Sequence, residues 1–268
     1  MNKFILEIGI EEVPSLYIDK AIQDIKNMAI SELKSLRISF GSIQTYGTPR
    51  RFIVYIEDIH SKQDDISQKI KGPSKLISFD EEGNLKNPAI KFAQMNQLNI
   101  DQLTIEKTDK GEYLFAKKCI LGEKTESLLP GFCLKLITSL NFPKSMRWGS
   151  NSFRFIRPIR WLLALYNDQV IPFQLEKLPS GSISYGHRLL SPWPINIGSV
   201  DKYFELMKEH SIVIDPEERR KIIIEQMNSI IREHHGEQCS DQKLLDEVKN
   251  LVEYPSVLLG KFHNDYLK

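Results

Sequence analysis

The stretch Phe153-Arg-Phe-Ile-Arg-Pro-Ile-Arg-Trp-Leu-Leu-Ala-Leu165 decides the fold because two patterns meet in it. Its second half alternates, so Trp161, Leu163 and Leu165 fall on one face of a strand predicted at Ile159 to Tyr166 and are expected in the core. Its first half belongs to a long segment, between Glu126 and Asp168, that contains no acidic residue, although the chain has 36 basic and 35 acidic residues. We therefore expect a buried strand preceded by an exposed, positively charged loop.

Cations and aromatic rings alternate in this loop, residues 142–157, which we call the basic–aromatic loop. A cation beside a flat ring suits a phosphate backbone and unpaired bases, so the pattern predicts an RNA-binding surface. The spacing leaves an alternative open, in which the arginines pair with carboxylates and the aromatic rings pack in the core. The RNA-binding candidates in and beside the loop are Lys144, Arg147, Trp148, Arg154, Arg157 and Arg160.

Two basic dipeptides add further candidates for RNA binding, Arg50-Arg51 and His187-Arg188. The planar fork of an arginine matches phosphate geometry, but Arg50 and Arg51 could equally brace a strand start against Glu11 or Glu12. A catalytic histidine needs an orienting partner, and the sequence names none for His187, so a structural or RNA-contacting role is favoured.

Hydrophobic periodicity predicts an α+β fold. Residues 1–60 are expected to form a small β-α-β-β unit, and residues 61–78, which are polar and contain Gly72-Pro73, a linker or exposed loop. Residues 79–198 are expected to form a mixed unit of hairpins and helices that carries the basic–aromatic loop. Residues 199–268 are expected to be mainly helical, with one helix beginning at Asp215-Pro-Glu-Glu218.

Individual elements are also predicted within these parts. The expected hairpins comprise residues 103–107 with 112–118, turning at Asp109-Lys-Gly111, and residues 159–166 with 170–175. A strand is expected at 182–188, a helix from Asp241 to Tyr254, and a final strand from Val257 to Phe262. Arg219-Arg-Lys221 is expected on the solvated face of its helix.

Composition limits the possible functions. A net charge of +1 gives no global argument for RNA binding, so that argument has to be local. The three cysteines form no Cys-x-x-Cys, which disfavours a zinc site or a disulfide framework, and we expect no metal site. Glu7 interrupts the first apolar run and no later run is long enough to cross a bilayer, so we expect a cytoplasmic chain without membrane association. The sequence contains neither Gly-x-x-x-x-Gly-Lys-Ser/Thr nor Gly-x-Gly-x-x-Gly, the two glycine motifs that bind the phosphates of nucleotides. We therefore predict no cofactor and no catalytic residue in this chain.

Short strings spread along the whole chain resemble one family in their order and spacing. They are Leu6-Glu-Ile-Gly-Ile-Glu-Glu-Val-Pro14, Gly47-Thr-Pro-Arg-Arg51, Lys71-Gly-Pro73, Gly111-Glu-Tyr-Leu-Phe-Ala116, Phe142-Pro-Lys-Ser-Met-Arg-Trp-Gly149, Arg154-Phe-Ile-Arg-Pro-Ile-Arg-Trp-Leu-Leu-Ala-Leu165, Gly186-His-Arg188, Glu217-Glu-Arg-Arg220 and Glu253-Tyr-Pro255. Together they resemble the β subunit of bacterial glycyl-tRNA synthetase, the heterotetrameric type. Arg160 stands where a histidine is expected, and Ile10 and Val13 replace a threonine and a leucine.

The resemblance implies an amino-terminal part of that subunit, because the chain ends at Lys268, before the metal-dependent-phosphohydrolase-like and anticodon-binding regions. It implies a non-catalytic portion of glycine–tRNA ligase, with the α subunit and the tRNA for glycine as partners in an α2β2 heterotetramer. ATP and magnesium would then be used on the α subunit. Two alternatives stay open: a purely structural assembly module without RNA contact, and a hydrolase that uses His187 with a carboxylate.

We expect the purified chain alone not to activate glycine, because the sequence contains no loop that could cradle the phosphates of ATP. The measurement is glycine-dependent exchange of labelled pyrophosphate into ATP, with a sample that also contains the α subunit as the positive control. Exchange by the chain alone, above a blank without glycine, would contradict this expectation.

Overall fold

The structure is a computed structural model that describes residues 1–150, 152–237 and 241–267. They form two compact units: unit 1 comprises residues 1–61 and the described residues after 124, and unit 2 comprises residues 62–124. Both units mix helices and strands, so the predicted α+β class is confirmed. No helix among the described residues has the length and apolar character that a bilayer span requires.

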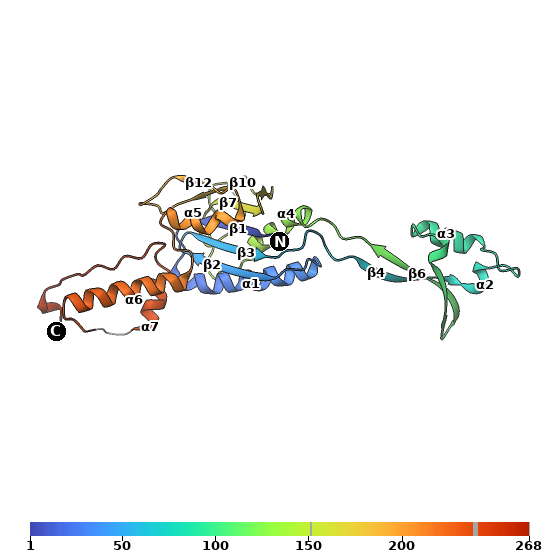
Figure 1. Ribbon diagram of the computed structural model, residues 1–268, viewed down its shortest axis with the longest axis horizontal. Coiled ribbons are helices and arrows are strands. Elements are labelled where there is room, and N and C mark those ends of the chain that lie inside the picture. Colours follow the sequence, from blue (N-terminus) through green and yellow to red (C-terminus); the bar gives the residue numbers. More distant parts are fainter. Residues whose placement is uncertain (151, 238–240, 268) are drawn as a thin grey trace. The chain divides into compact units, whose positions relative to one another are not determined.

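A seven-stranded sheet forms the centre of unit 1 (Figure 1), with the order β2-β3-β1-β7-β10-β9 and β8 paired with β7. All neighbours are antiparallel except β7 and β10, which are parallel. The strands are β1 (Phe4–Ile10), β2 (Ser42–Thr48), β3 (Arg51–Glu57), β7 (Ile159–Tyr166), β8 (Gln169–Val170), β9 (Gln174–Leu175) and β10 (Leu178–Gly181). The predicted β-α-β-β start is confirmed as β1, α1 (Ile18–Ser35), β2 and β3.

Strand β1 is buried on both faces, because a helical layer covers each side of the sheet. Phe4, Leu6 and Ile8 pack with α1 and α4 (Thr125–Thr138) on one side. Ile5 packs on the other side with β12 (Pro194–Asn196), α5 (Tyr203–Glu209) and the residues that follow. Figure 1 shows α1 and α5 on opposite sides of the sheet. Glu7 lies on the same strand and is fully buried, so its charge has to be compensated inside the protein.

Trp161, Leu163 and Leu165 are all buried, as the alternation predicts. The indole ring of Trp161 lies against Gly9, its neighbour across the β1–β7 pair. A Cβ atom at position 9 would stand 1.9 Å from that ring, so only glycine permits this approach. Trp161 Nε1 donates to Glu7 Oε1 at 2.7 Å, which satisfies the polar atom of the ring.

Most of the remaining elements of unit 1 follow strand β10 in the chain. Helix α6 (Pro216–Glu233) begins as predicted, because the Asp215 side chain accepts from Glu217 N at 2.9 Å and Pro216 stands in the first turn. The other elements are α7 (Gln242–Val248), β11 (Ile183–Tyr185), which pairs with β12, and the 3₁₀ helices η1 (Ser15–Tyr17), η3 (Val200–Lys202) and η4 (Asn264–Leu267).

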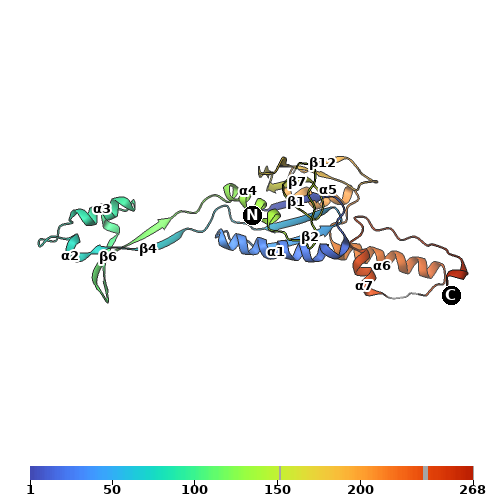
Figure 2. The ribbon, with the colours of Figure 1, turned by 180° about the vertical axis from the view of Figure 1, so that it is seen from behind.

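Unit 2 contains the residues for which a linker was expected, and the structure differs there. Residues 61–78 include strand β4 (Ile66–Ser74) and helix α2 (Lys75–Ser78). Strand β4 pairs with β6 (Gly111–Ile120), which pairs with β5 (Leu103–Thr108) in the predicted hairpin. Helix α3 (Asn87–Met95) packs beside β4 (Figure 2), and η2 (Ile100–Gln102) precedes β5. No residue of β4 is fully buried, and the buried side chains of this sheet are Leu114 and Ala116 of β6, so β4 can keep the polar sequence of a loop.

Several elements of unit 1 are shorter than predicted. Strand 182–188 is reduced to β11, the second strand of the hairpin at 170–175 is divided into β8 and β9, and no strand forms over the predicted final stretch, 257–262. Helix α7 ends at Val248, before the expected Tyr254. The early end of α7 has a physical reason: the carbonyl of Lys249 accepts a hydrogen bond from Nε of Arg219 at 2.7 Å. Arg219 itself is fully buried. The expectation of a solvated Arg219 is therefore wrong.

Arg51 is buried as well, so we remove it from the RNA-binding candidates. Its guanidinium has no exposed surface and pairs with Glu253 at 2.9 Å and with Glu7 at 3.3 Å. Further donors surround the two carboxylates: Thr48 Oγ1 donates to Glu253 Oε1 at 2.6 Å, and Tyr203 Oη donates to Glu7 Oε2 at 2.5 Å. The bracing role is thus the correct alternative for Arg51, with Glu7 and Glu253 as partners instead of Glu11 or Glu12.

The ionisation of this buried cluster follows from its geometry. Burial alone raises the pKa of Glu253, but the charge of Arg51 and the hydrogen bonds from Thr48 and Arg51 outweigh it and hold the pKa below its usual 4.5. Burial of Arg51 opposes its charge, and the fields of Glu253 and Glu7 raise its pKa above the usual value. Burial lowers the pKa of Arg219 to about 10, so Arg219 stays charged at neutral pH.

We expect Trp161→Ala to lower the free energy of unfolding by about 3–5 kcal/mol, because it opens a cavity above Gly9 and removes a donor to a buried carboxylate. Trp193, of which 72% is exposed against 6% for Trp161, provides the matched control, and Trp193→Ala should change stability by less than about 0.5 kcal/mol. Urea denaturation of the three proteins measures both values, and equal midpoints would show that Trp161 is not a core residue.

We expect Glu253→Gln to destabilise the chain by about 1.5–3 kcal/mol at neutral pH, since it removes the charge from the hydrogen bonds that Arg51 and Thr48 donate to Glu253, while Arg51 keeps its pair with Glu7. The folded pKa of Glu253 lies below 4.5, so the stability that its ionisation contributes is present above pH 4.5 and is lost as the pH falls through the folded value. The difference between parent and variant should therefore shrink below that pH. Denaturation midpoints across a pH series measure it, with the exposed Glu233→Gln as control, and a constant difference would contradict the assignment.

Candidate nucleic-acid interface

The basic–aromatic loop exposes three of its four cations, whereas Arg157 is half-buried, and it turns its rings inward. Lys144, Arg147 and Arg154 are exposed, and no carboxylate lies within 4.0 Å of any of them in the part of the chain that the structure describes. A backbone bridge between Met146 and Phe155 closes the loop. Arg154 Nη2 donates to the Ser145 carbonyl at 2.8 Å, which holds its stem against the loop and leaves the charge in solvent.

The aromatic rings of the loop form a chain of contacts onto the core. Phe155 is fully buried, Phe142 meets it edge to face at 5.1 Å, and Phe153 stacks on it at 5.8 Å. Trp148 packs edge to face on Phe153 at 6.2 Å and is itself half-buried. The rings therefore pack on the core, as the second alternative expects, but the cations are exposed instead of paired, and RNA binding by the loop stays a prediction. The geometry supports packing more than base stacking for Trp148.

A second basic group surrounds a pocket that the topology assembles from distant parts of unit 1. Glu11 follows β1, Arg50 lies in the turn between β2 and β3, and Arg160 and Trp161 lie at the start of β7. Tyr185 ends β11, and Arg188 lies three residues further on. We call this the arginine pocket; its lining residues are Glu11, Arg50, Arg160, Trp161, Tyr185 and Arg188.

Weak ion pairs hold two of the three arginines of the pocket. Arg160 Nε lies 3.4 Å from Glu11 Oε1, and Arg188 Nη1 lies 3.1 Å from Glu12 Oε1. Arg157 adjoins the same segment, because its Nε donates to the Glu12 carbonyl at 3.1 Å. Both ion pairs are well exposed, and such pairs contribute only about 0–1 kcal/mol.

Arg50 is held differently. No carboxylate lies within 4.0 Å of it among the residues that the structure describes, and its Nε atom is buried without a hydrogen-bond partner. Its guanidinium stands 5.7 Å from the centroid of the Trp161 ring, a cation–π distance. The ring thus positions this cation without neutralising it.

His187 supports the chain beside the pocket and has no catalytic geometry. Its Nδ1 atom accepts from the backbone N–H groups of Leu189 and Leu190 at 3.3 and 3.2 Å, so the ring caps a turn. In the described ranges no carboxylate lies within 4.0 Å of His187, which removes the basis for the hydrolase alternative. Of the two favoured roles, structural or RNA-contacting, this geometry agrees with the structural one, and RNA contact by His187 stays a prediction.

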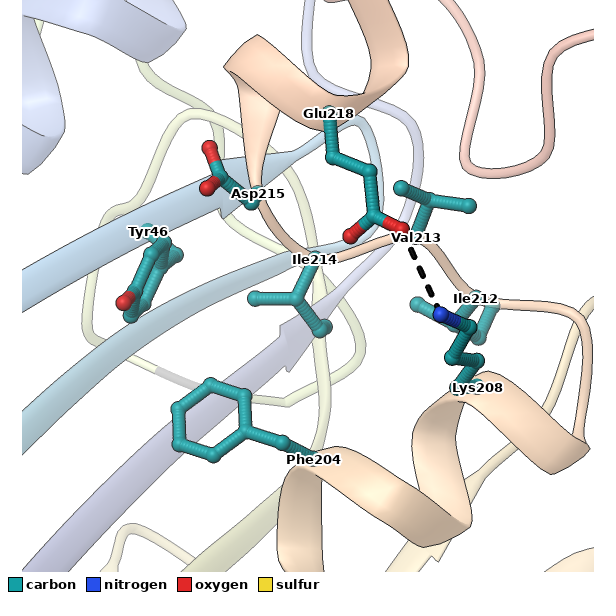
Figure 3. Close-up of a pocket in the computed structure, with 8 residues that line it drawn as sticks. All are labelled: Tyr46, Phe204, Lys208, Ile212, Val213, Ile214, Asp215 and Glu218. Carbon is teal, nitrogen blue, oxygen red and sulfur yellow. Dashed lines mark hydrogen bonds and ion pairs between the residues drawn. The ribbon is translucent and has the colours of Figure 1, made fainter. Parts of the chain in front are cut away.

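A second pocket of unit 1 has unsuitable chemistry for a phosphate. Figure 3 shows its apolar wall, with Tyr46, Phe204 and Ile214, and the carboxylates of Asp215 and Glu218 at its rim. Asp215 also caps α6, and the Lys208 ammonium is engaged with Glu218 at 3.5 Å. Anionic groups would be repelled here, so within the described part of unit 1 we take the arginine pocket and the basic–aromatic loop as the candidate sites for RNA.

Among the described residues, no cluster of three or more histidines, cysteines or carboxylates is arranged to hold a metal ion. Cys119 and Cys133 are free thiols, and burial raises the pKa of the Cys133 thiol. Cys239 lies outside the described residues. Sequence reasoning did not find Tyr185, although it directly precedes the quoted Gly186-His-Arg188, because only the fold brings β11 beside β7.

Comparisons with known proteins agree on one family. A family model described as glycyl-tRNA synthetase beta subunit matches residues 4–268. A glycine–tRNA ligase beta subunit of Syntrophus aciditrophicus is 41% identical over 267 residues, which cover all of this chain and 39% of that relative. Those of Listeria monocytogenes (strain EGD-e) and Bacillus subtilis are each 39% identical and cover 99% and 98% of this chain, but only 38% of each relative. The chain spans about two fifths of the length of these relatives. It belongs to the family of glycyl-tRNA synthetase beta subunits and corresponds to an amino-terminal part of its longer members.

Proposed function

We propose that the chain is a non-catalytic β-subunit portion of a glycine–tRNA ligase, which helps to bind tRNA for ATP-dependent attachment of glycine. The observation that carries this proposal is the arrangement of the basic–aromatic loop. Its rings anchor the loop on the core, and Lys144, Arg147 and Arg154 project as exposed cations without ion-pair partners among the described residues. Cations held on a rigid base suit the phosphates of a structured RNA.

The partners in this proposal come from the family. The chain would form a scaffold with the α subunit in an α2β2 assembly in the cytoplasm, and the α subunit would use ATP and magnesium. In this chain the carboxylates of Glu11 and Glu12 are engaged with Arg160 and Arg188.

One observation favours the second candidate, a structural assembly module without RNA contact. The half-buried Trp148 and Phe153 belong to the core cluster of unit 1, so the loop could serve to present a protein-binding surface. The two candidates predict different effects of removing the exposed cations. The first predicts a lower affinity for RNA, and the second predicts weaker assembly with the α subunit.

We expect the triple variant Lys144→Gln, Arg147→Gln, Arg154→Gln to bind the tRNA for glycine more weakly, with the loss shrinking as salt rises. Each lost phosphate contact should lower the slope of log affinity against log salt by about 0.7–0.9, hence by about 2–3 for all three. Fluorescence anisotropy with labelled tRNA, across a salt series and with and without the α subunit, measures this slope.

The matched control neutralises three exposed lysines elsewhere in unit 1, Lys20, Lys202 and Lys221, and changes the net charge equally. An equal loss in both triple variants would mean that only net charge matters. Unchanged tRNA affinity together with lost α-subunit association would establish the assembly module.

A further inference from the structure

We propose that the arginine pocket binds one unpaired nucleotide of the RNA, with its arginines on the phosphate and the exposed part of Tyr185 against the base. The proposal rests on the proposed tRNA-binding function and assigns it a specific subsite. Its basis is the combination of charge, shape and aromatic surface at one place, which the basic–aromatic loop lacks.

Charge is the first element of the argument. Three arginines and one carboxylate, that of Glu11, line the pocket, so cations exceed anions by two. The neighbouring Arg157 and Glu12 add one charge of each sign and leave this excess unchanged. Arginine in particular suits a phosphate, because its planar fork donates two parallel hydrogen bonds.

The second element is that these cations are available. The side chains of Arg160 and Arg188 are 60% and 61% exposed. Their partners Glu11 and Glu12 also lie at the protein surface. A phosphate that enters the pocket can replace these carboxylates at little cost, since exposed ion pairs contribute little to stability. Arg50 does not have to release a carboxylate before it binds a phosphate. It lies over the Trp161 ring, and among the residues that the structure describes no carboxylate pairs with it.

The third element is shape. The arginines come from the β2–β3 turn, from β7 and from the segment after β11, and they surround a concave site. The phosphates of an RNA duplex line a convex backbone, whereas an unpaired nucleotide can turn its phosphate and its base into a recess. A single nucleotide therefore fits this pocket better than a duplex segment does.

The aromatic floor is the fourth element. The ring centroids of Tyr185 and Trp161 lie 4.9 Å apart, and the planes of the two rings form an angle of 59°. Gly9 covers one side of the Trp161 ring, and Arg50 and Arg51 stand over it, so this ring is a support and not a stacking surface. Tyr185 is only half-buried and lines the pocket, so its ring is the aromatic group that a base entering the pocket would meet. Stacking on one such ring tolerates any base, so we expect no strong base preference.

The test compares two RNAs with the same number of phosphates, one a blunt-ended hairpin and the other a shorter hairpin with a single-stranded extension. The proteins are the chain and its Arg160→Gln, Arg188→Gln variant, and both replaced side chains are exposed enough to leave the fold intact. The chain should bind the extended RNA roughly tenfold more tightly than the blunt one, the magnitude expected for one stacked and charge-held base. The variant should lose this preference and keep most of its affinity for the blunt hairpin.

Controls separate the pocket from the rest of the surface. Lys144→Gln, in the basic–aromatic loop, should weaken binding of both RNAs alike, and Lys202→Gln should affect neither. Tyr185→Leu, which keeps an apolar side chain, should reduce the preference for the extended RNA without changing the salt slope. Thermal melting of each variant confirms that it is folded.

The outcomes distinguish this inference from the function on which it rests. If the arginine variant weakens both RNAs equally, the pocket is only part of a diffuse basic surface, and the inference fails while tRNA binding stands. If the chain binds neither RNA but binds free AMP through the same arginines, both fail and the pocket is a site for small nucleotides. If the variant instead loses the α subunit and keeps its RNA preference, the arginines contact protein, and the inference fails.

Discussion

The buried guanidinium of Arg51 is the constraint on which the arrangement of unit 1 depends. A charge without access to water is costly unless it is paired and hydrogen-bonded. Arg51 meets this requirement with Glu7 from the central strand β1 and Glu253 from the segment after α7, two residues far apart in the chain. Both carboxylates depend on this one guanidinium for their pairing, so the cluster fixes the C-terminal segment that carries Glu253 against the sheet. Arg219 reinforces this by donating to the carbonyls of Val213 and Gly47.

Trp161 connects this buried cluster with the outer surface. Its indole nitrogen donates to Glu7 inside, while another part of the ring lines the arginine pocket. The consecutive residues Arg50 and Arg51 stand 5.7 and 5.6 Å from its centroid, one at the pocket and one in the core. The core therefore fixes the Trp161 ring that lies beneath the arginines of the pocket. Gly9 permits this position of the ring, because any larger residue would clash with it.

Local sequence patterns predicted the elements whose formation depends on local chemistry. The Asp215 cap of α6, the left-handed Gly111 in the β5–β6 turn and the alternation through Trp161 all belong to this class. Patterns failed where distant residues decide. Arg219 has the sequence setting of a solvated cation but is buried, and the stretch expected as a linker is a strand whose partner lies about fifty residues later. The arginine pocket belongs to the same class, because four separate segments have to fold before it exists.

The motifs that carry the family resemblance have a physical connection that their separate positions conceal. Leu6–Pro14 supplies Glu7, Gly47–Arg51 supplies Thr48 and Arg51, and Glu253–Pro255 supplies Glu253, so three of the strings meet in one buried cluster. The first string also supplies Glu11 and Glu12, which hold Arg160 and Arg188 at the pocket. Both ion pairs are exposed to solvent, so they contribute little to stability. A single segment therefore serves two purposes: its buried carboxylate, Glu7, helps to fix the fold, and its surface carboxylates, Glu11 and Glu12, pair with the pocket arginines.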